Sequence, residues 1–244
     1  MSGALWHAGA MISQSLPAPS LAHVTDWVFD LDNTLYPREC NLFAQIDRLM
    51  TQYMMQVTSL DMVAARTLQK EYYRDFGTTL NGLMHLHDID PDHFLRTVHN
   101  IDYSPVEANG ALLDAIRALP GRKFILTNGD VGHANSVLGR LGHADGLFED
   151  VFDIRAMSFK PKPHAEAYTA FFERNGIDPS HAAMFDDLEK NLVVPHAVGM
   201  STVQVIAGEQ FTHDLVEAWE LEQTGGPHVH HVTANLASFL TKLP

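Results

Sequence analysis

Two carboxylates follow a run of large apolar residues near the start of the chain. The stretch DWVFDLDNTLYP places Asp30 and Asp32 two positions apart, directly after Trp27–Phe29, with the hydroxyl of Thr34 close behind. Burying a charged group beside an apolar strand is costly, so this arrangement needs a reason. Residues two apart on a strand share a face, so both acids can meet one substrate. Paired carboxylates of this kind can supply nucleophilic and acid–base catalysis.

Three further polar clusters stand at comparable places along the chain. TNG at 127–129 follows the apolar run KFILT, and DD at 186–187 follows AAMF. Lys162, in KPKPHAEAY, comes just before the predicted helix that leads to the AAMF strand. In doubly wound sheets the ligand site lies outside the carboxyl ends of the strands. We therefore expect these groups to converge with the first acidic pair on one crevice.

The elements that must position these groups alternate between strands and helices. Short runs rich in Val, Ile and Phe predict buried parallel strands at 27–29, 123–127, 182–185 and 201–206, with a weaker candidate at 151–154. Amphipathic helices are expected at 134–141 and from 165 to a stop at Gly176. This alternation predicts an α/β fold, a doubly wound, Rossmann-like parallel sheet.

The alternation is interrupted after the first strand, where residues 41–102 show a helical pattern throughout. Asp61 and Gly77 are expected to begin and end a second helix of this segment, and Asp90 followed by proline is a typical helix start. The segment predicts an all-helical cap domain inserted into the sheet domain. The predicted organisation is a loosely ordered tail over 1–24, a catalytic core over 25–36 and 105–244, and a cap over 37–104.

Composition restricts the partners of the protein. The 244 residues are 45% hydrophobic and 19% charged, as in an ordinary globular protein, and the formal net charge is −14. This charge argues against binding nucleic acid or an anionic membrane through bulk electrostatics, and an anionic substrate would need a local positive centre. The single cysteine, Cys40, excludes an intramolecular disulfide and suggests a reducing compartment. No segment has the features of a secretory signal or a membrane span, so we expect a cytoplasmic protein, monomeric or homodimeric.

The ordered motifs DLDNT at 30–34, TNG at 127–129, KP at 162–163 and DD at 186–187 resemble the four motifs of the haloacid dehalogenase superfamily. The resemblance covers nearly the whole chain from Trp27 onward, and the helical insertion is similar to that superfamily's first type of cap. A more specific resemblance, to the subgroup of pyrimidine 5′-nucleotidases, lies in the stretches FGTTLNGLM, DPDHFL, NIDYS, LPGRKFILTNG and MFDDLEKNL.

The chemistry of the residues independently favours a phosphatase. A phosphomonoester is largely a dianion near pH 7, and two unit charges 4 Å apart interact by roughly 4 kcal/mol at an effective dielectric of about 20. The acids at Asp30, Asp186 and Asp187 therefore need cations to hold it. Mg²⁺ suits such oxygen ligands where phosphate shares its coordination shell, and Lys162 supplies a fixed positive charge.

In this interpretation Asp30 attacks phosphorus and forms an aspartyl-phosphate. Asp32 protonates the leaving alkoxide and later activates water. Thr127 and the amides of Asn128 and Gly129 are candidates to hold the phosphoryl oxygens.

By resemblance to the superfamily, the Asp30 carboxylate, the Asp32 main-chain carbonyl and an aspartate of the last motif hold the Mg²⁺. Asp187 is favoured as the direct ligand and Asp186 as its neighbour outside the ligand set. Lys162 is preferred to Lys160 because an aromatic residue follows it six positions on, as in the family.

Purely structural interpretations stay open for each motif. Asp32 and Thr34 can cap a turn, TNG can form a turn, and the acidic pair at 186–187 can cap a helix. His85 with His87, or His228 with His230 and His231, could in principle hold zinc, but no cysteine or third convergent ligand accompanies them. Thr78, Thr79 and Asn81 either face the substrate or form a plain interhelical loop. We expect an acidic surface helix within 208–226, an edge strand within 228–233 and a closing helix from about residue 235.

The leading functional hypothesis is a Mg²⁺-dependent phosphomonoesterase that acts on a small phosphate ester, most simply UMP or CMP. Its alternatives are a phosphatase of another small metabolite, such as a sugar phosphate or phosphoglycolate, related phosphoryl transfer within a sugar phosphate, a 2-haloacid dehalogenase, and a non-catalytic nucleotide-binding protein. Asp32 and Asp187 count against the dehalogenase, because relatives with that activity generally lack these acids.

Overall fold

A six-stranded, wholly parallel β-sheet forms the larger lobe of the protein, in the order β3-β2-β1-β4-β5-β6. The structure is a computed structural model, and it describes residues 20–142, 144–208 and 225–243. The strands are β1 (Asp26–Phe29), β2 (Arg122–Leu126), β3 (Asp150–Phe152), β4 (Ala182–Asp186), β5 (Ser201–Val205) and β6 (His231–Thr233). The predicted doubly wound parallel sheet is confirmed, including the weak third strand and the edge strand.

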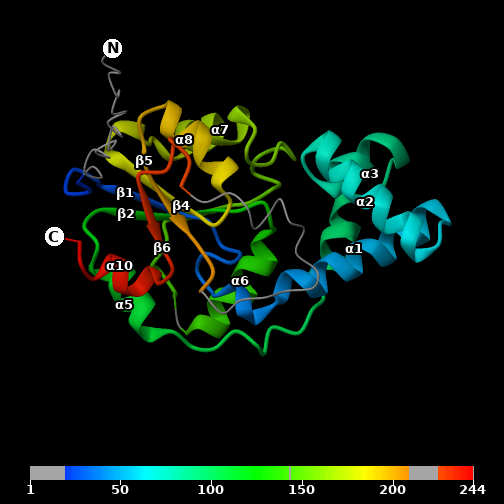
Figure 1. The fold of residues 1–244 in the computed structure, drawn as a ribbon, viewed down its shortest axis with the longest axis horizontal. Coiled ribbons are helices and arrows are strands. Elements are labelled where there is room, and N and C mark those ends of the chain that lie inside the picture. Colours follow the sequence, from blue (N-terminus) through cyan, green and yellow to red (C-terminus); the bar gives the residue numbers. More distant parts are fainter. Residues whose placement is uncertain (1–19, 143, 209–224, 244) are drawn as a thin grey trace, which may run out of the picture.

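Helices cover both faces of the sheet (Figure 1). On one face lie α5 (Gly110–Ala118), α6 (Val131–Leu141) and α10 (Leu236–Leu240); on the other lie α7 (Ala165–Asn175) and α8 (Val193–Ala197). Two apolar clusters fill the space between the helices and the sheet, the first against α5, α6 and α10 and the second against α7. β1 lies between β2 and β4 and is buried on both faces of the sheet, and its residues Trp27, Val28 and Phe29 form an uninterrupted apolar run.

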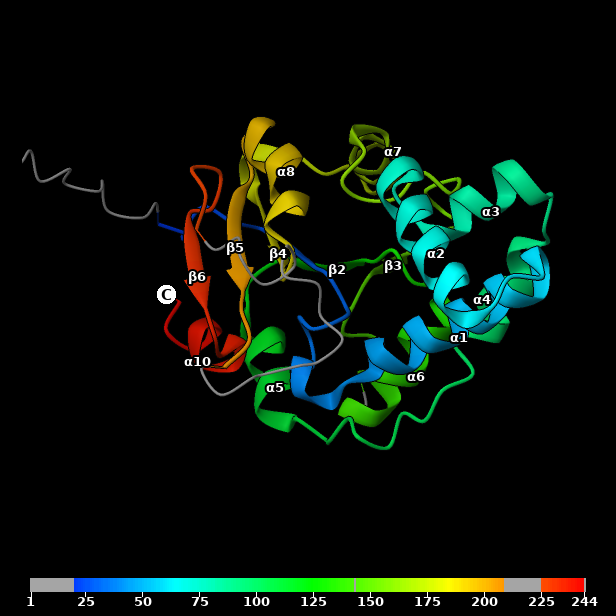
Figure 2. The same ribbon diagram turned by 45° about the vertical axis from the view of Figure 1, so that its right-hand side comes forward.

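Four helices between β1 and β2 form a second lobe beside the sheet (Figures 1 and 2). They are α1 (Leu42–Thr58), α2 (Met62–Phe76), α3 (Thr79–His87) and α4 (Pro91–Val98). Asp61 accepts a hydrogen bond from the Ala64 amide at the start of α2, and Gly77, at φ 80°, ends that helix. Asp90 caps α4 in the same way. The predicted starts and end are thus confirmed.

The cap helices have an apolar core of their own. It gathers residues from all four helices and one residue of the sheet domain, Ile154, from the loop after β3. The buried members are Ile46, Tyr53, Met54, Ala65, Tyr72, Leu80, Leu83, Phe94, Leu95, Val98 and Ile154. The two lobes therefore pack as separate cores that touch near the carboxyl ends of the strands.

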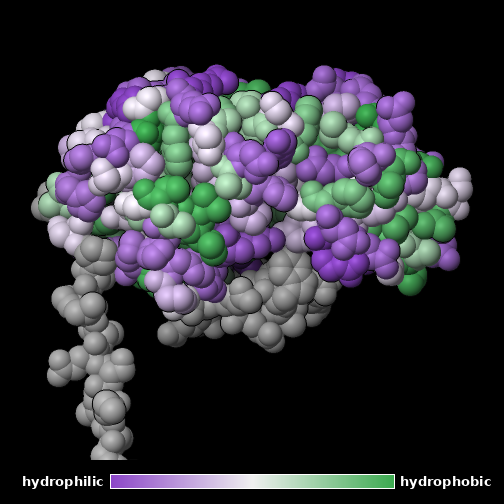
Figure 3. All heavy atoms as spheres, turned by 90° about the horizontal axis from the view of Figure 1, so that it is seen from above, coloured by the Kyte–Doolittle hydropathy of each residue, from purple (hydrophilic) through white to green (hydrophobic). Residues whose placement is uncertain are grey.

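The structure near the two chain ends differs in part from the prediction made from the sequence. Leu21 and Val24 are 4% and 1% exposed within the core of the sheet domain, so the described end of the predicted tail packs against the sheet. The rest of that tail and nearly all of the predicted acidic helix at 208–226 lie outside the described residues. No helix among the described residues is long and apolar enough to cross a membrane. Figure 3 shows polar and apolar residues interspersed over the face that it presents.

Candidate active site

The chain leaves the central strand β1 directly at the first acidic motif. The Asp30 amide donates to the Phe185 carbonyl at 2.8 Å, which extends the pairing of β1 with β4 by one residue. The chain then turns, because the amides of Thr34 and Leu35 both donate to the Leu31 carbonyl. Leu31 is fully buried in the core of the sheet domain, which leaves Asp30 and Asp32 at the carboxyl end of the strand. Both line a cavity there, as the alternating directions of strand residues predict.

Three carboxylates converge at this edge. Asp30, Asp186 and Asp187 each offer an oxygen within 4.8 Å of the others, and all three residues are buried. Lys162 joins two of them: its Nζ lies 2.8 Å from Asp30 Oδ1 and 2.6 Å from Asp186 Oδ2. We call the three acids the core cluster.

The surroundings distinguish the two acids of the last motif. Asp186 Oδ1 accepts from the Leu188 amide and from Asn191 Nδ2, both at 2.9 Å, so both of its oxygens are occupied once Lys162 is counted. Asp187 accepts from Arg38 at 2.7 Å and from Asn33 at 3.2 Å, in both cases on Oδ2. This difference is compatible with Asp187 as the direct metal ligand and Asp186 outside the ligand set.

When all three acids of the core cluster are ionised, Lys162 and Arg38 do not neutralise them, and the pKa values of the acids respond to this imbalance. Burial raises the pKa of Asp30 well above its usual value, opposed by Lys162 and reinforced by Asp186. Burial and the charge of Asp186 likewise raise the pKa of Asp187 to about 7, against the effect of Arg38. Burial would lower the pKa of Lys162, but the charges of Asp186 and Asp30 raise it instead. Two cations therefore do not offset three acids.

This imbalance is the test of whether the predicted Mg²⁺ fits. A divalent cation would turn the deficit into a net positive charge, which a phosphate dianion requires. Buried carboxylate oxygens within 4.8 Å of one another are the hard donors that Mg²⁺ prefers. Among the described residues, this is the only group of three or more acidic, histidine or cysteine side chains close enough to share a metal ion. The residues present fit the ion.

Asp32 stands apart from the core cluster. Its Oδ1 accepts from the Tyr36 hydroxyl at 2.5 Å and from His133 Nε2 at 2.7 Å. Burial would raise the pKa of Asp32, but the charge of His133 and the hydrogen bonds from His133 and Tyr36 lower it to about 2. The carboxylate therefore makes long-range contacts with α6 rather than serving only its own turn.

The TNG motif supports the site in three different ways. Thr127 is fully buried and accepts a hydrogen bond from the Gly129 amide at 3.0 Å, so its hydroxyl keeps a proton to donate. The Asn128 side chain exchanges two hydrogen bonds with the main chain of Lys162, at 2.8 and 3.1 Å. Asn128 and Gly129 line the cavity. The side chain of Asn128 thus positions Lys162, which sequence reasoning did not foresee.

Other predicted candidates fall outside the site or at its edge. Lys160 is exposed and lies 3.6 Å from Glu166, whereas Lys162 lies in the centre of the site. Thr78 and Thr79 line the cavity. The histidines considered for zinc do not form a metal-binding group within the part of the chain that the structure describes; His228, for example, lies 3.3 Å from Glu189.

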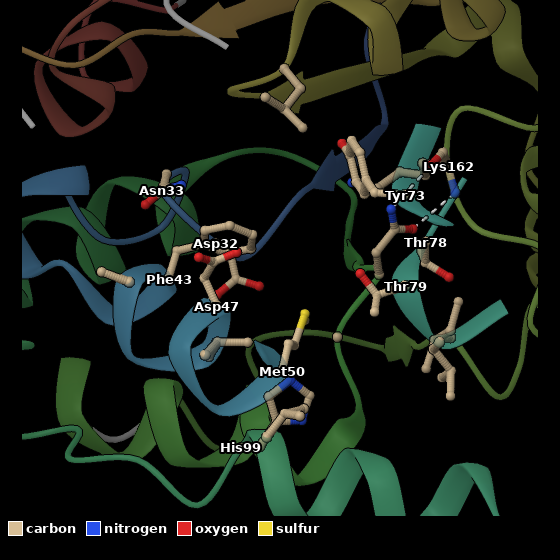
Figure 4. Close-up of a pocket in the computed structure, with 18 of the residues that line it drawn as sticks. Asp32, Asn33, Phe43, Asp47, Met50, Tyr73, Thr78, Thr79, His99 and Lys162 are labelled. Atoms are coloured by element: carbon tan, nitrogen blue, oxygen red, sulfur yellow. Dashed lines mark hydrogen bonds between the residues drawn. The ribbon is translucent and has the colours of Figure 1, made fainter. Parts of the chain in front are cut away.

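The cavity extends from the core cluster into the cap and has a volume of about 210 Å³. Figure 4 shows Asp32, Asn33, Phe43 and Met50 on one side of it, with Tyr73, Thr78, Thr79 and Lys162 on the other. Its cap wall is largely apolar; the members are Phe43, Ala44, Ile46, Met50, Leu80, Phe94, Leu95 and Val98.

A second charged group interrupts this wall. Asp47 of α1 is 4% exposed and accepts from Arg66, Gln69 and Lys70 of α2, at 2.5, 2.7 and 3.0 Å. We call these four residues the cap cluster. Asp47, Gln69 and Lys70 line the cavity, whereas Arg66 does not. The cap cluster was not anticipated from the sequence, because nothing in the helical pattern marks which polar residues face a cavity.

The sequence pattern also did not identify three further site residues, which are Tyr36, Arg38 and His133. A usable signal existed for His133: it follows Asp130, the N-cap of the helix after β2, by three residues. The first turn of a helix after a parallel strand lies at the same edge of the sheet as the strand end. A histidine at this place can therefore reach the groups that the strands deliver.

A family model described as a hydrolase of the haloacid dehalogenase-like type matches residues 28–194 of this chain. The matched segment contains the core cluster, Asp32, Lys162 and the whole cap.

Solved structures of several hydrolases share the fold. A haloacid dehalogenase (HAD) phosphatase from Thermococcus onnurineus superposes with a TM-score of 0.57 at 16% identity, over 89% of this chain and 97% of its own. The L-2-haloacid dehalogenase of Xanthobacter autotrophicus, with chloropropionic acid covalently bound, gives 0.52 at 15%, over 89% and 97%. A Bacillus subtilis protein described as a HAD-type hydrolase bound to magnesium gives 0.54 at 16%, over 90% and 98%. At such identities the likeness shows the fold alone.

Proposed function

The chain belongs to the haloacid dehalogenase-like hydrolases, and from that premise we propose that it is a Mg²⁺-dependent phosphomonoesterase that acts on pyrimidine nucleoside 5′-monophosphates. The observation that carries the proposal is the charge of the core cluster. Three buried acids beside two cations are suited to a divalent ion and, with it, to a phosphate dianion.

The proposed reaction has two displacements at phosphorus. In the first, a carboxylate oxygen of Asp30 forms a bond to phosphorus while the bond from phosphorus to the ester oxygen breaks. Asp32 passes the proton on its Oδ2 to the departing oxygen, and the hydrogen bonds from His133 and Tyr36 to Oδ1 stabilise the carboxylate that remains. In the second, Asp32 takes a proton from water, the water oxygen bonds to phosphorus, and the bond to Asp30 breaks.

The fixed groups have separate tasks. Lys162 holds Asp30 and Asp186 in place through its two short contacts, and Asn128 holds Lys162 in turn. The Thr127 hydroxyl and the Asn128 and Gly129 amides are the proposed donors to the phosphoryl oxygens. Asp30, the Asp32 main-chain carbonyl and Asp187 would hold Mg²⁺. When bound, the ion supplies positive charge that offsets the carboxylates and the phosphoryl oxygens.

The cap wall supports a nucleotide as substrate. A nucleobase has flat apolar faces and a polar edge, and the wall offers both kinds of surface. Phe43, Met50 and Phe94 supply apolar contact, while Lys70 interrupts that surface with a charged donor. Lys70 Nζ gives one hydrogen bond to Asp47 and has two further protons for a carbonyl group of the base.

The fold alone does not choose between ester hydrolysis and dehalogenation, because solved structures of both kinds resemble the chain. The site favours the ester. Dehalogenation needs no metal, so it gives no reason for the third acid of the core cluster. It also gives no proton-transfer role to Asp32.

The proposal is tested by phosphate release from a panel of nucleoside monophosphates and sugar phosphates, first with Mg²⁺ and then with excess chelator. We expect release that is led by UMP or CMP and abolished by the chelator. Release led by another ester would keep the mechanism and refute the pyrimidine assignment. Halide release from 2-haloacids without phosphate release from any ester would refute the phosphatase itself.

A further inference from the structure

Asp32 belongs to a hydrogen-bonded chain that leads out of the site toward the cap. Its Oδ1 lies 2.7 Å from His133 Nε2, and His133 Nδ1 lies 2.9 Å from the Tyr103 hydroxyl. The Tyr103 hydroxyl in turn donates to the carbonyl of His99 at 3.0 Å. His99 directly follows α4 as its C-cap, and Tyr103 lies in the segment that returns from the cap to the sheet domain. The chain of hydrogen bonds thus joins the residue after the last cap helix to a carboxylate of the active site.

The single proton of the Tyr103 hydroxyl determines which edge of the His133 ring faces Tyr103. A hydroxyl has one proton, and Tyr103 gives it to a carbonyl that can only accept. Toward His133, Tyr103 must therefore accept, so Nδ1 carries a proton and donates it. That bond holds Nε2 toward Asp32. A ring turned the other way would place Cδ2 rather than Nδ1 next to Tyr103 and lose the contact.

Packing excludes other positions of the ring. The side chain of His133 is fully buried, and its ring stacks on that of His99 with 4.5 Å between centroids and 16° between planes. A Cβ at Gly129 would lie 3.2 Å from His133 Cδ2 and 3.7 Å from Asp32 Oδ2, so the glycine leaves room for both groups. His99 itself lies 3.4 Å from Asp130, the N-cap residue of α6.

We propose that His133 is the positioning residue of Asp32 and that Tyr103, with His99, links its position to that of the cap. This inference rests on the proposed role of Asp32 as acid and base. Asp32 can approach the leaving oxygen in only a narrow range of directions, since His133 and Tyr36 both hold its Oδ1. That arrangement leaves Oδ2 for the substrate. His99 directly follows α4, and Tyr103 packs against the core of the sheet domain, so the two residues span the junction through which the position of the cap would act on the orientation of Asp32.

The first test compares two kinds of leaving group. UMP releases an alkoxide that needs a proton, whereas p-nitrophenyl phosphate releases a stable phenolate that does not. His133→Phe keeps the aromatic ring against His99 but removes both nitrogen contacts. We expect it to lower kcat for UMP about 30- to 100-fold, at or below the lower end of the usual contribution of acid–base catalysis because Asp32 itself remains, with KM changed less than about twofold. The burst of p-nitrophenol, which reports the first step alone, should slow by less than about threefold.

Two further variants separate positioning from folding. His133→Gln retains an amide that can reach Asp32 and should recover about tenfold of the lost kcat. Tyr103→Phe removes the hydroxyl that orients the ring and should lower kcat for UMP about 3- to 10-fold. Tyr53→Phe is the matched control, because Tyr53 also contacts a histidine Nδ1, that of His93, at 3.1 Å, away from the cavity. An equal loss on both substrates, or a Tyr103→Phe enzyme as active as the Tyr53→Phe control, would overturn the proposal.

A measurement that needs no substrate distinguishes failure of this inference from failure of the proposed function. The ring N–H protons of His133 are observed by NMR in protein with ¹⁵N-labelled histidine. If the chain positions His133, Tyr103→Phe shifts the Nδ1–H signal and speeds its exchange, whereas Tyr53→Phe leaves it in place. Signals unchanged by Tyr103→Phe refute the positioning chain even if the enzyme hydrolyses UMP. A wild-type protein inactive on every ester refutes the phosphatase, while the NMR result still decides on the chain.

Discussion

Two buried carboxylate clusters line the same cavity, one from each lobe, and their charges are balanced in opposite ways. The core cluster has three acids, with Lys162 and Arg38 as cations in contact. The cap cluster has one acid, Asp47, with Arg66 and Lys70 as cations and the amide of Gln69 as a further donor. The core cluster has fewer cations than acids, whereas the cap cluster has more cations than acids.

The difference has a physical consequence for each lobe. A buried acid without enough cations costs folding free energy and favours a bound cation, so the core cluster is built for a ligand of positive charge. A buried acid with more donors than it needs has its charge offset, and the remaining protons of Gln69 and Lys70 face whatever occupies the cavity. In the proposed function, the core cluster therefore determines the reaction and the cap wall determines which leaving group is accepted.

The largest expected effect comes from removing one acid of the core cluster. Asp30→Asn should lower phosphate release more than about 1,000-fold, because the amide cannot attack phosphorus. The same variant should not lose stability in metal-free buffer, because it takes a charge from an overcharged cluster. Asp26→Asn is the matched control: it lies on the same strand at the opposite end, where Asp26 pairs with Arg122. An Asp30→Asn enzyme with full activity would remove the nucleophile from the mechanism.

The second-largest expected effect tests whether the core cluster binds Mg²⁺. Mg²⁺ at about 100 times its dissociation constant should stabilise the folded protein by ~2.7 kcal/mol, through binding to the folded state alone. The midpoint of thermal unfolding measured against Mg²⁺ concentration gives this value. Asp187→Asn should abolish most of the shift, whereas Asp26→Asn should keep it. An equal Mg²⁺ response in the Asp187→Asn protein would place the ion elsewhere.

The two clusters should also respond with opposite sign to the same substitution. In metal-free buffer Asp47→Asn should lower the free energy of unfolding by about 2 kcal/mol, because two ion pairs are lost and both cations are only partly exposed. Asp187→Asn should raise it, since burial and Asp186 disfavour the charged carboxylate. Urea unfolding of the two variants measures the difference. Changes of the same sign would show that the clusters are not balanced in opposite ways.

The two clusters also differ in how far the sequence predicts them. The acids of the core cluster follow apolar strands, and parallel strands bring their carboxyl ends to one edge, so Asp30, Asp186 and Asp187 could be placed together from the pattern alone. The choice of Lys162 over Lys160 came from the resemblance to the superfamily. The helix starts of the cap were equally visible, since Asp61 and Asp90 are side-chain caps.

The contacts that depend on how two helices pack could not be predicted. Asp47 meets Lys70 because α1 and α2 lie side by side at a particular rotation, and an amphipathic period fixes a face only to within a residue or two. The contact of His133 with Tyr103 likewise depends on the path of the chain between α4 and α5, although the place of His133 in the first turn of α6 was visible in the sequence. These contacts are determined by tertiary packing, which the local sequence pattern does not specify.

The smallest effect concerns the side of the cap cluster that faces the cavity. Lys70→Met keeps the approximate length of the side chain and removes its hydrogen-bond donors. It should raise KM for UMP about fivefold, which corresponds to the ~1 kcal/mol of binding free energy that one hydrogen bond typically contributes. Its kcat for UMP and its KM for p-nitrophenyl phosphate, which has no base, should stay within about twofold.

Arg66→Met makes the same chemical change in a residue that contacts Asp47 but does not line the cavity. It should lower stability as much as Lys70→Met while leaving KM for UMP unchanged. If both variants raise KM equally, the cap cluster acts on the substrate only by holding α1 against α2, and the cap wall recognises the leaving group by shape rather than by charge.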